Sequence, residues 1–432
     1  MIPAGNDFVK GAGMPTVLEK MTLIDGLGQC LPDAVMVFEN NQIAAAGPRG
    51  QVNIPEDAVR HDLSGKFVMP GLIDAHIHLD MHGMADTCHE SLVEDKLRTL
   101  RAAREMANTL RSGITTVRNA GSANYIDIAV KRAVEEGLIP GPRILASGRI
   151  ICMLSAGSEY FKGLYLEADG VDENRRAARE QIKEGADVLK VMATGAIMNP
   201  GGIPGAAQLD VDEIRAVVNE GQKAGKHTAA HAHGAQGIKN AVRAGVRTIE
   251  HGTLADAEAL KMMADSGVYL ISTLSSNYWM CNNDSEEICQ QIPRFMSDKA
   301  NDVARIRLEN LHHAIAAGVS VIMGTDAGTP YNFHGKNAME LIQYVKNGLM
   351  DPMEAIIAAT SRAAKALGLE DRVGSLTPGK LADCIVVHQN PIDDIEALGS
   401  LEQIFLVFKD GKPVSGKVDT SQWSPDSPLG PG

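Results

Sequence analysis

Eight apolar, β-branched stretches recur through the middle of the chain, and helix-like stretches separate them. The eight candidate strands are residues 66–80, 113–121, 142–150, 186–195, 226–234, 246–253, 267–275 and 319–327. Eight strands that alternate with helices over roughly 250 residues predict an α/β protein with a closed (β/α)8 barrel of the TIM type. The alternative is a doubly wound open sheet, which usually has fewer strands and often a Gly-rich dinucleotide turn that this sequence lacks.

Both ends of the chain have a different pattern. Residues 14–65 and 373–415 contain short strand-like runs with Gly and Asn turns. We expect these runs to pair into one small β-sandwich domain, with its first part in residues 1–65 and its second part in residues 371–432. The barrel would then occupy residues 66–370. The last twelve residues, 421–432, are rich in Pro, Gly and Ser and are predicted to be extended or disordered.

Composition excludes several classes of protein. The chain has 432 residues, 44% hydrophobic and 22% charged, which is ordinary for a globular protein. Its net charge of -13 argues against a nucleic-acid or anionic-membrane partner. Six scattered cysteines without a CxxC pair indicate reduced thiols. Neither a signal peptide nor a run of about 18 apolar residues is evident, so we expect a cytoplasmic protein with no membrane span.

Polar residues gather near the C-terminal ends of the candidate strands, where the catalytic groups of barrels lie. The ends of the first, fifth, sixth and eighth strands carry His76 and His78, His231 and His233, His251, and Asp326. Each HxH pair by itself is equally compatible with packed core histidines, and "GTDAG" by itself with a simple turn. Together, these imidazole and carboxylate groups predict a site for Zn²⁺ or a similar divalent ion.

Lys190 lies in the apolar stretch "EGADVLKVMATGA", which reads as a buried strand. Burying an ammonium group is costly, so the plain alternative is a lysine that reaches solvent from the strand end. Beside two metal ions, burial and positive charge would depress its pKa. The free amine could then add CO₂ and form an anionic carbamate. We therefore predict that carboxylated Lys190 bridges two divalent metal ions.

These motifs resemble those of the amidohydrolase superfamily. "VMPGLIDAHIHLD" resembles its first-strand signature and "GTDAG" its last, and the intervening motifs are similar to the imidazolonepropionase-like and prolidase-like branch. The resemblance covers nearly the whole chain. It implies two metal ions, the first held by His76, His78 and Asp326, the second by His231 and His251, with Lys190 as the bridge. The loop "RIICMLSAGSEYFKG" departs from the Gly/His-rich loop that relatives often have after the third strand.

The resemblance implies a homo-oligomeric enzyme that hydrolyses amide bonds through a metal-bridging hydroxide. We predict a dipeptidase for Xaa-Pro or other Xaa-hydrophobic dipeptides, with N-acyl amino acids as related substrates. Asp326 would move the proton and His233 would polarise the carbonyl, although His233 could equally be a packing residue. Tyr278, Tyr331 and His334 are candidate substrate contacts in loops. The alternatives are a cyclic-amide hydrolase, a deaminase, or a scaffold that has lost its metal.

Overall fold

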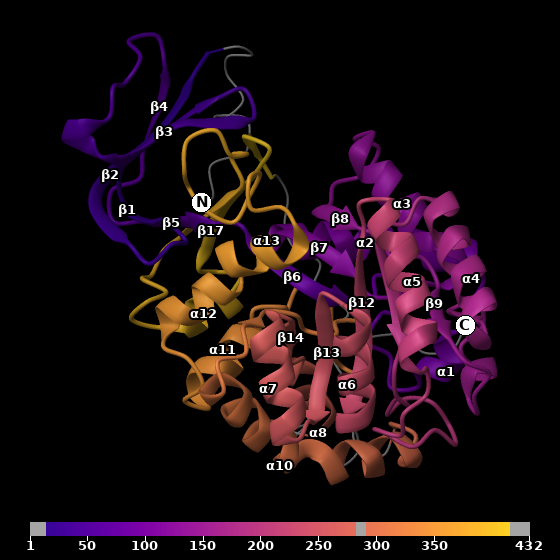
Figure 1. Ribbon diagram of the computed structural model, residues 1–432. Coiled ribbons are helices and arrows are strands. Elements are labelled where there is room, and N and C mark those ends of the chain that lie inside the picture. Colours follow the sequence, from indigo (N-terminus) through magenta and orange to yellow (C-terminus); the bar gives the residue numbers. More distant parts are fainter. Residues whose placement is uncertain (1–13, 282–290, 415–432) are drawn as a thin grey trace. The chain divides into compact units, whose positions relative to one another are not determined.

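The structure is a computed structural model that describes residues 14–281 and 291–414 (Figure 1). The described residues form two compact units, one of residues 14–74, 107–116 and 335–414, the other of residues 75–106, 117–281 and 291–334. The predicted domain boundaries after residues 65 and 370 stay a prediction. The Pro/Gly/Ser-rich tail, predicted to be extended, lies outside the described residues.

Each of the eight predicted stretches contains a strand, and most of these strands belong to one parallel sheet. In its order, the sheet consists of β10 (Tyr165–Glu167), β9 (Ile150–Cys152), β11 (Val188–Met192), β12 (His227–Gly234), β13 (Thr248–Leu254), β14 (Tyr269–Ile271) and β15 (Val321–Ile322). All of its neighbouring pairs are parallel. A three-stranded sheet holds β6 (Leu72–Ile77), β7 (Ile114–Asn119) and β8 (Arg143–Leu145). This mixed α/β arrangement is consistent with a TIM-like barrel.

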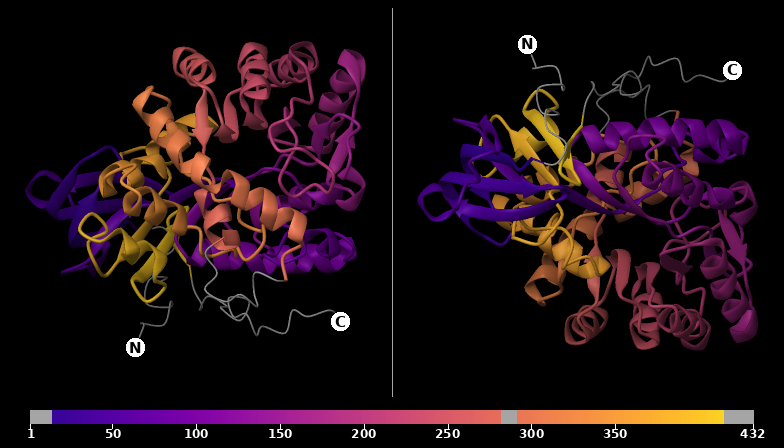
Figure 2. Two further views of the ribbon diagram at one scale, coloured as in Figure 1. Left: turned by 90° about the horizontal axis from the view of Figure 1, so that it is seen from below. Right: turned by 90° about the horizontal axis from the view of Figure 1, so that it is seen from above.

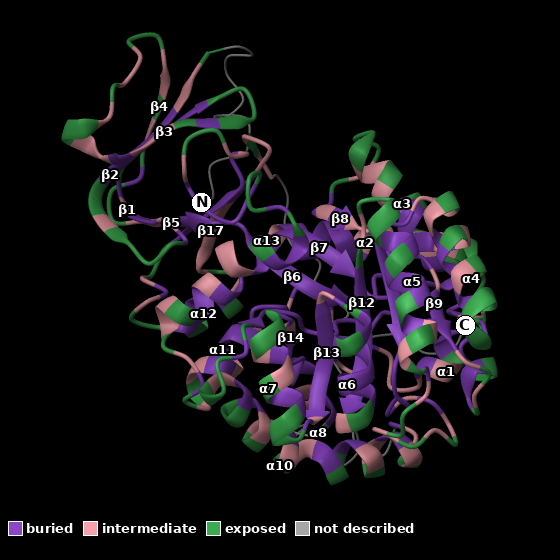
Figure 3. Ribbon diagram, viewed as in Figure 1, coloured by how far each residue is buried: buried purple, intermediate pink, exposed green. Residues whose placement is uncertain are grey.

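Helices lie between most of the parallel strands in sequence. They are α4 (Gly170–Glu184), α5 (Val211–Lys223), α6 (Ala235–Ala244), α7 (Ala257–Ser266), α8 (Leu274–Cys281) and α10 (Arg294–Ala316). Figure 3 shows buried residues along β12 and β13 and exposed residues on the outer faces of α5 and α7. Asp210 accepts hydrogen bonds from the backbone N–H groups of Asp212 and Glu213 and so caps the start of α5.

The remaining α-helices of the described residues have between 4 and 17 residues. They are α1 (Thr87–Glu90), α2 (Asp95–Arg111), α3 (Ile126–Glu135), α11 (Met339–Lys346), α12 (Pro352–Ala358) and α13 (Ser361–Leu367). Every helix among the described residues is too short or too polar to cross a membrane. The cytoplasmic location and the homo-oligomeric state remain predictions.

Both chain ends contribute strands to one further sheet, as the sequence predicted. Its members are β1 (Thr16–Ile24), β2 (Cys30–Glu39), β3 (Gln42–Pro48), β4 (Val59–Asp62), β5 (Phe67–Pro70), β16 (Cys384–Val387), β17 (Ile404–Lys409) and β18 (Lys412–Pro413). The two ends meet where β5 pairs with β16 in antiparallel register, and Figure 2 shows the indigo and yellow segments together. Asp410 and Gly411 turn β17 into β18 with φ of 50° and 72°, as an Asp-Gly hairpin turn requires. A two-layer sandwich remains a prediction.

Candidate metal centre

Two strand ends bring the first three predicted ligands together. His76 and His78 are two residues apart at the end of β6 and therefore point to the same side of the strand. The backbone N–H of Asp326 donates to the carbonyl of His76 over 2.7 Å, and the N–H of His78 donates to the carbonyl of Ala327 over 2.8 Å. These backbone bonds fix the "GTDAG" turn directly beside the two histidines.

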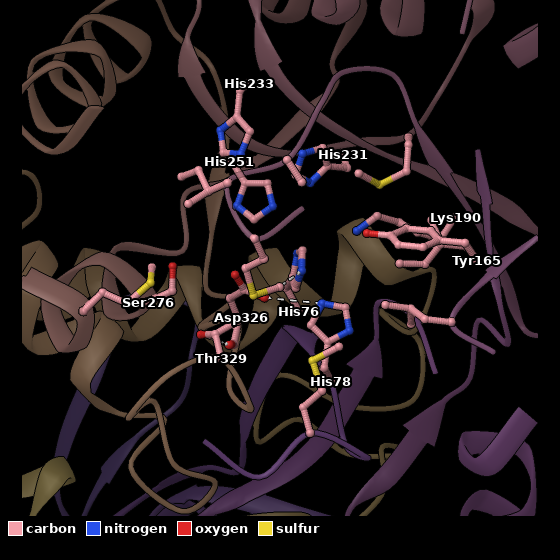
Figure 4. A pocket seen from close by; sticks show the side chains of 18 of the residues that line it. His76, His78, Tyr165, Lys190, His231, His233, His251, Ser276, Asp326 and Thr329 are labelled. Carbon is pink, nitrogen blue, oxygen red and sulfur yellow. Dashed lines mark hydrogen bonds and ion pairs between the residues drawn. The ribbon is translucent and has the colours of Figure 1, made fainter. Parts of the chain in front are cut away.

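The ring nitrogens of this first group have separate roles. His76 Nδ1 lies 2.6 Å from Glu250 Oε2, and His78 Nδ1 lies 2.9 Å from the carbonyl of Gly121. Both partners can only accept, so each Nδ1 donates, and each Nε2 is the ring atom left to bind a cation. Both Nε2 atoms lie 3.4 Å from Asp326 Oδ1 (Figure 4). Two imidazole Nε2 atoms and a carboxylate oxygen thus lie close together, an arrangement that suits a divalent cation.

Burial and charge act in opposite directions on Asp326. Burial alone would raise the pKa of its carboxyl group, but His76 and His78 outweigh that effect and hold the pKa well below its usual range. Asp326 is therefore ionised and is 7% exposed. It offers the negative charge that a metal ion at this position needs.

A second group consists of His231, His233 and His251, whose ligand atoms lie within 4.8 Å of one another. His251 Nδ1 lies 2.8 Å from the hydroxyl of Thr273, which leaves Nε2 as the ring atom that can bind a metal ion. His231 differs, because its Nε2 lies 3.4 Å from the carbonyl of Gly195, and Nδ1 is therefore the ring atom that can bind a metal ion. The pKa of His231 is lowered to about 3, and burial is the largest cause. The ring is therefore neutral and able to bind a metal.

His233 is held beside these two rings. Its Nδ1 lies 2.9 Å from the hydroxyl of Thr253, and its ring stacks on that of His251 with 4.7 Å between the centroids. The sequence predicted His233 as a catalytic or packing residue. The structure also places it within ligand distance of the second group.

Lys190 reaches the same centre from β11 and is 2% exposed. Among the described residues its Nζ forms neither a hydrogen bond nor an ion pair, and Lys190 lines the cavity together with the histidines (Figure 4). Burial lowers the pKa of Lys190 to about 8, while the negative charge of Glu250 acts in the opposite direction. The carbamate hypothesis requires a buried amine at this position whose pKa lies close to neutral pH.

A buried ion pair behind His76 was not predicted from the sequence. Arg118 Nη2 lies 2.7 Å from both carboxylate oxygens of Glu250, and Arg118 Nη1 donates to Thr248 Oγ1 over 2.9 Å. Burial alone would raise the pKa of Glu250, but Arg118, Lys190 and His76 together keep it far below its usual range. The available signals were an arginine inside the apolar stretch 113–121 and a glutamate directly before His251.

The backbone is strained at this centre. His251, Thr273 and Asp326 have φ of 73°, 52° and 61°, a region that non-glycine residues rarely adopt. Gly324 is needed for a different reason, because a Cβ there would lie 2.9 Å from the Cβ of His76 and 2.4 Å from Ile271 Cγ2. The "GTDAG" turn can approach β6 closely only with glycine at this position.

The two ligand groups line one cavity. One wall is apolar and includes Met81, Ile150, Leu164, Tyr165 and Met192. The sequence did not predict this wall, because its members come from loops and strands far apart in the chain. Arg307 and Ser276 also line the cavity and were likewise not predicted.

The three predicted substrate residues are not among those that line the cavity. Tyr278 is half-buried in α8, and the hydroxyl of Tyr331 donates to Gln291 Oε1 over 3.2 Å. His334 is buried, and its Nε2 lies 2.9 Å from the carbonyl of Met81 and 3.2 Å from that of His78. His334 therefore holds the backbone that follows His76 and His78.

Comparison with known proteins agrees with this arrangement. The model of the amidohydrolase family matches residues 67–414. The chain belongs to the amidohydrolase family. The ochratoxinase of Aspergillus niger is 30% identical to it over 429 residues, covering 93% of this chain and 87% of that protein.

Two solved structures are similar to this amidohydrolase over nearly its full length. The crystal structure of an Xaa-Pro dipeptidase with bound methionine in the active site is 32% identical, with a TM-score of 0.85, covering 93% of this chain and 100% of the other. A prolidase complexed with N-methylphosphonate-L-proline is 29% identical, with a TM-score of 0.84, covering 94% and 100%. This amidohydrolase is thus a hydrolase of C–N bonds in the prolidase-like branch of its superfamily.

Proposed function

We propose that this amidohydrolase is a metal-dependent dipeptidase that cleaves Xaa-Pro or other Xaa-hydrophobic dipeptides. The observation that carries the proposal is the convergence of two buried ligand groups and Lys190 on one cavity. Similarity to an Xaa-Pro dipeptidase and a prolidase supports the choice of substrate.

The residues present fit two divalent ions, which we propose to be zinc. His76, His78 and Asp326 would hold the first ion, His231 and His251 the second, and Lys190 would bridge them as a carbamate. When bound, the ions would supply Lewis acidity that polarises the scissile carbonyl and acidifies the attacking water. Neutral imidazoles together with an anionic oxygen are the donor set expected for zinc.

Asp326 carries out the proton transfers in this proposal. Its ionised carboxylate accepts a proton from the water that attacks the scissile carbonyl carbon. It then returns that proton to the leaving nitrogen as the C–N bond breaks, so the proton balance closes. The leaving nitrogen of an Xaa-Pro amide is tertiary and departs only after protonation. His233, held by Thr253, polarises the carbonyl from the other side of the cavity.

A second candidate is the hydrolysis of N-acyl amino acids with a bulky acyl group. The apolar wall favours it, because Tyr165 and Met192 line the same cavity as Lys190 and can pack against an aromatic ring. The similarity to an ochratoxinase supports this candidate. A cyclic-amide hydrolase or a deaminase on the same scaffold is the alternative reaction.

The test is turnover of a dipeptide library and of N-acyl amino acids by the zinc-loaded protein, with metal content measured in parallel. We expect about two metal ions per chain and hydrolysis of Xaa-Pro or Xaa-hydrophobic dipeptides. Turnover of cyclic amides together with no turnover of any dipeptide or N-acyl amino acid would overturn the proposal.

A further inference from the structure

One end of the cavity is polar and is organised around Arg307, which lies in α10 and is 3% exposed. Arg307 Nη1 donates to the carbonyl of Thr273 over 3.2 Å, and Arg307 Nε donates to Thr253 Oγ1 over 3.4 Å. The hydroxyls of the same two threonines hold His251 and His233. Thr253 and Thr273 therefore connect the guanidinium group of Arg307 to His233 and His251.

Ser276 extends this polar end. Its hydroxyl donates to the carbonyl of Thr273 over 3.2 Å, the same carbonyl that Arg307 contacts. Ser276 and Thr329 both line the cavity, and Figure 4 shows them beside Asp326, away from Lys190 and Tyr165. The polar end and the apolar wall thus lie on different sides of the first ligand group.

The cations that line the cavity limit where a substrate anion can bind. Besides the histidines, the positively charged groups among the described lining residues are Lys190 and Arg307. Lys190 belongs to the proposed metal bridge. At the opposite end, the Tyr165 hydroxyl donates to Asn199 Oδ1 over 2.9 Å, within an apolar cluster. Arg307 is therefore the group best placed to receive a carboxylate.

We propose that Arg307 binds the free carboxylate of the substrate and so restricts this amidohydrolase to amides whose amine part is an α-amino acid. The inference rests on the proposed function and adds the group that selects the substrate. A guanidinium group matches a carboxylate through two parallel hydrogen bonds, which a lysine cannot reproduce. The substrate's acyl side chain would then lie against Tyr165 and Met192.

The experiment compares free acids with their C-terminal amides. The probes are Phe-Pro with Phe-Pro-amide and N-benzoyl-phenylalanine with its amide, and the proteins are wild type, Arg307→Met, Arg307→Lys and the control Arg305→Met. Arg305 lies on the same helix and is 83% exposed, so its loss should change nothing. We expect Arg307→Met to lower kcat/KM on the free acid by about 10²–10³-fold more than on the amide, mainly through KM. Arg307→Lys should keep part of the preference.

A structural role for Arg307 predicts a different result. If Arg307→Met lowers kcat/KM for acid and amide equally, or changes neither, the inference is wrong. Binding of N-acetyl-phenylalanine and N-acetyl-phenylalaninamide, measured by calorimetry, does not depend on turnover. The wild type should prefer the acid and Arg307→Met should not. If the wild type hydrolyses neither probe pair but shows this difference in binding, the proposed function fails while the role of Arg307 stands.

Discussion

His76 Nδ1 donates its proton to Glu250 Oε2 over 2.6 Å, and Glu250 is in turn held by both of its oxygens against Arg118. His76 and Glu250 are both buried, at 1% and 0% exposure. A carboxylate behind a ligating histidine fixes the ring's orientation and tautomer and makes its other nitrogen a better ligand. The first ligand group, His76, His78 and Asp326, therefore depends on Glu250, which is not a member of that group.

Glu250→Gln should weaken metal binding. The neutral amide no longer balances Arg118 and orients His76 poorly, so we expect metal affinity to fall by about 10–100-fold. Leaving Arg118 buried without its anionic partner should also cost about 3–5 kcal/mol of unfolding free energy. Competition with a chelator measures the first effect and denaturant unfolding the second.

A matched control separates the two effects. Glu105 is also a buried carboxylate, and it accepts hydrogen bonds from Arg104 away from the centre. Glu105→Gln should lower stability but leave metal affinity unchanged. Equal metal affinity in Glu250→Gln and in the wild type would show that Glu250 does not position His76.

Lys190→Ala should abolish activity and reduce the bound metal, because the anionic bridge is removed. Short carboxylic acids that enter the space left behind should restore part of the rate, and a misfolded variant could not respond in that way. Metal content and turnover with and without added acetate or propionate are the measurements. Lys261→Ala, which removes an exposed lysine paired with Asp265, is the control. Normal metal content and normal turnover in Lys190→Ala would rule out the bridging role.

The candidate metal ligands could be predicted from the sequence for a physical reason. Histidine, lysine and aspartate are conspicuous at the ends of apolar strands, and the strand period places His76 and His78 on one side. The strand-helix alternation likewise predicted the parallel strands, and the two β-rich ends predicted the shared sheet.

The rest depends on packing between residues far apart in the chain. Arg307 lies in the middle of a helix, where an arginine is ordinarily a surface residue, and only the fold turns it toward the cavity. His334 was predicted as a substrate contact from its polar loop, and packing places its Nε2 at the backbone carbonyls of His78 and Met81. The short strand β9 falls in the loop that departs from relatives and β10 follows that loop, where the local sequence pattern was weakest.

Glu90 should make stability depend on pH. Burial raises its pKa to about 8, although the backbone N–H of His82 and the charge of Arg98 act against that shift, while Asp80 adds to it. His82 N–H donates to Glu90 Oε1 over 2.7 Å, and Oε2 has no hydrogen-bond partner among the described residues. The folded state therefore holds a proton that the unfolded state, with its ordinary pKa near 4.5, releases.

The direction of the change in stability with pH follows from the difference between the folded and unfolded pKa of Glu90. Between about pH 4.5 and 8 the stability contributed by protonated Glu90 falls as pH rises, by at most about 1.4 kcal/mol per pH unit, and the loss is complete above the folded pKa. Glu90→Gln keeps the acceptor and cannot ionise, so its stability relative to the wild type should rise over this range. Thermal unfolding of both proteins from pH 5 to 8 measures the gap, and parallel curves would contradict the prediction.

Asp326→Asn should separate metal binding from proton transfer. The amide keeps an oxygen near His76 and His78 but cannot accept a proton from water, so we expect kcat to fall by about 10²–10⁴-fold while most of the metal is retained. Asp302→Asn, an exposed site on α10, is the control for the same change in charge. Metal analysis and kcat on the best dipeptide of the library are the measurements. A variant that keeps more than about a tenth of the wild-type kcat would show that another group moves the proton, since general acid–base groups contribute at least about 10²-fold.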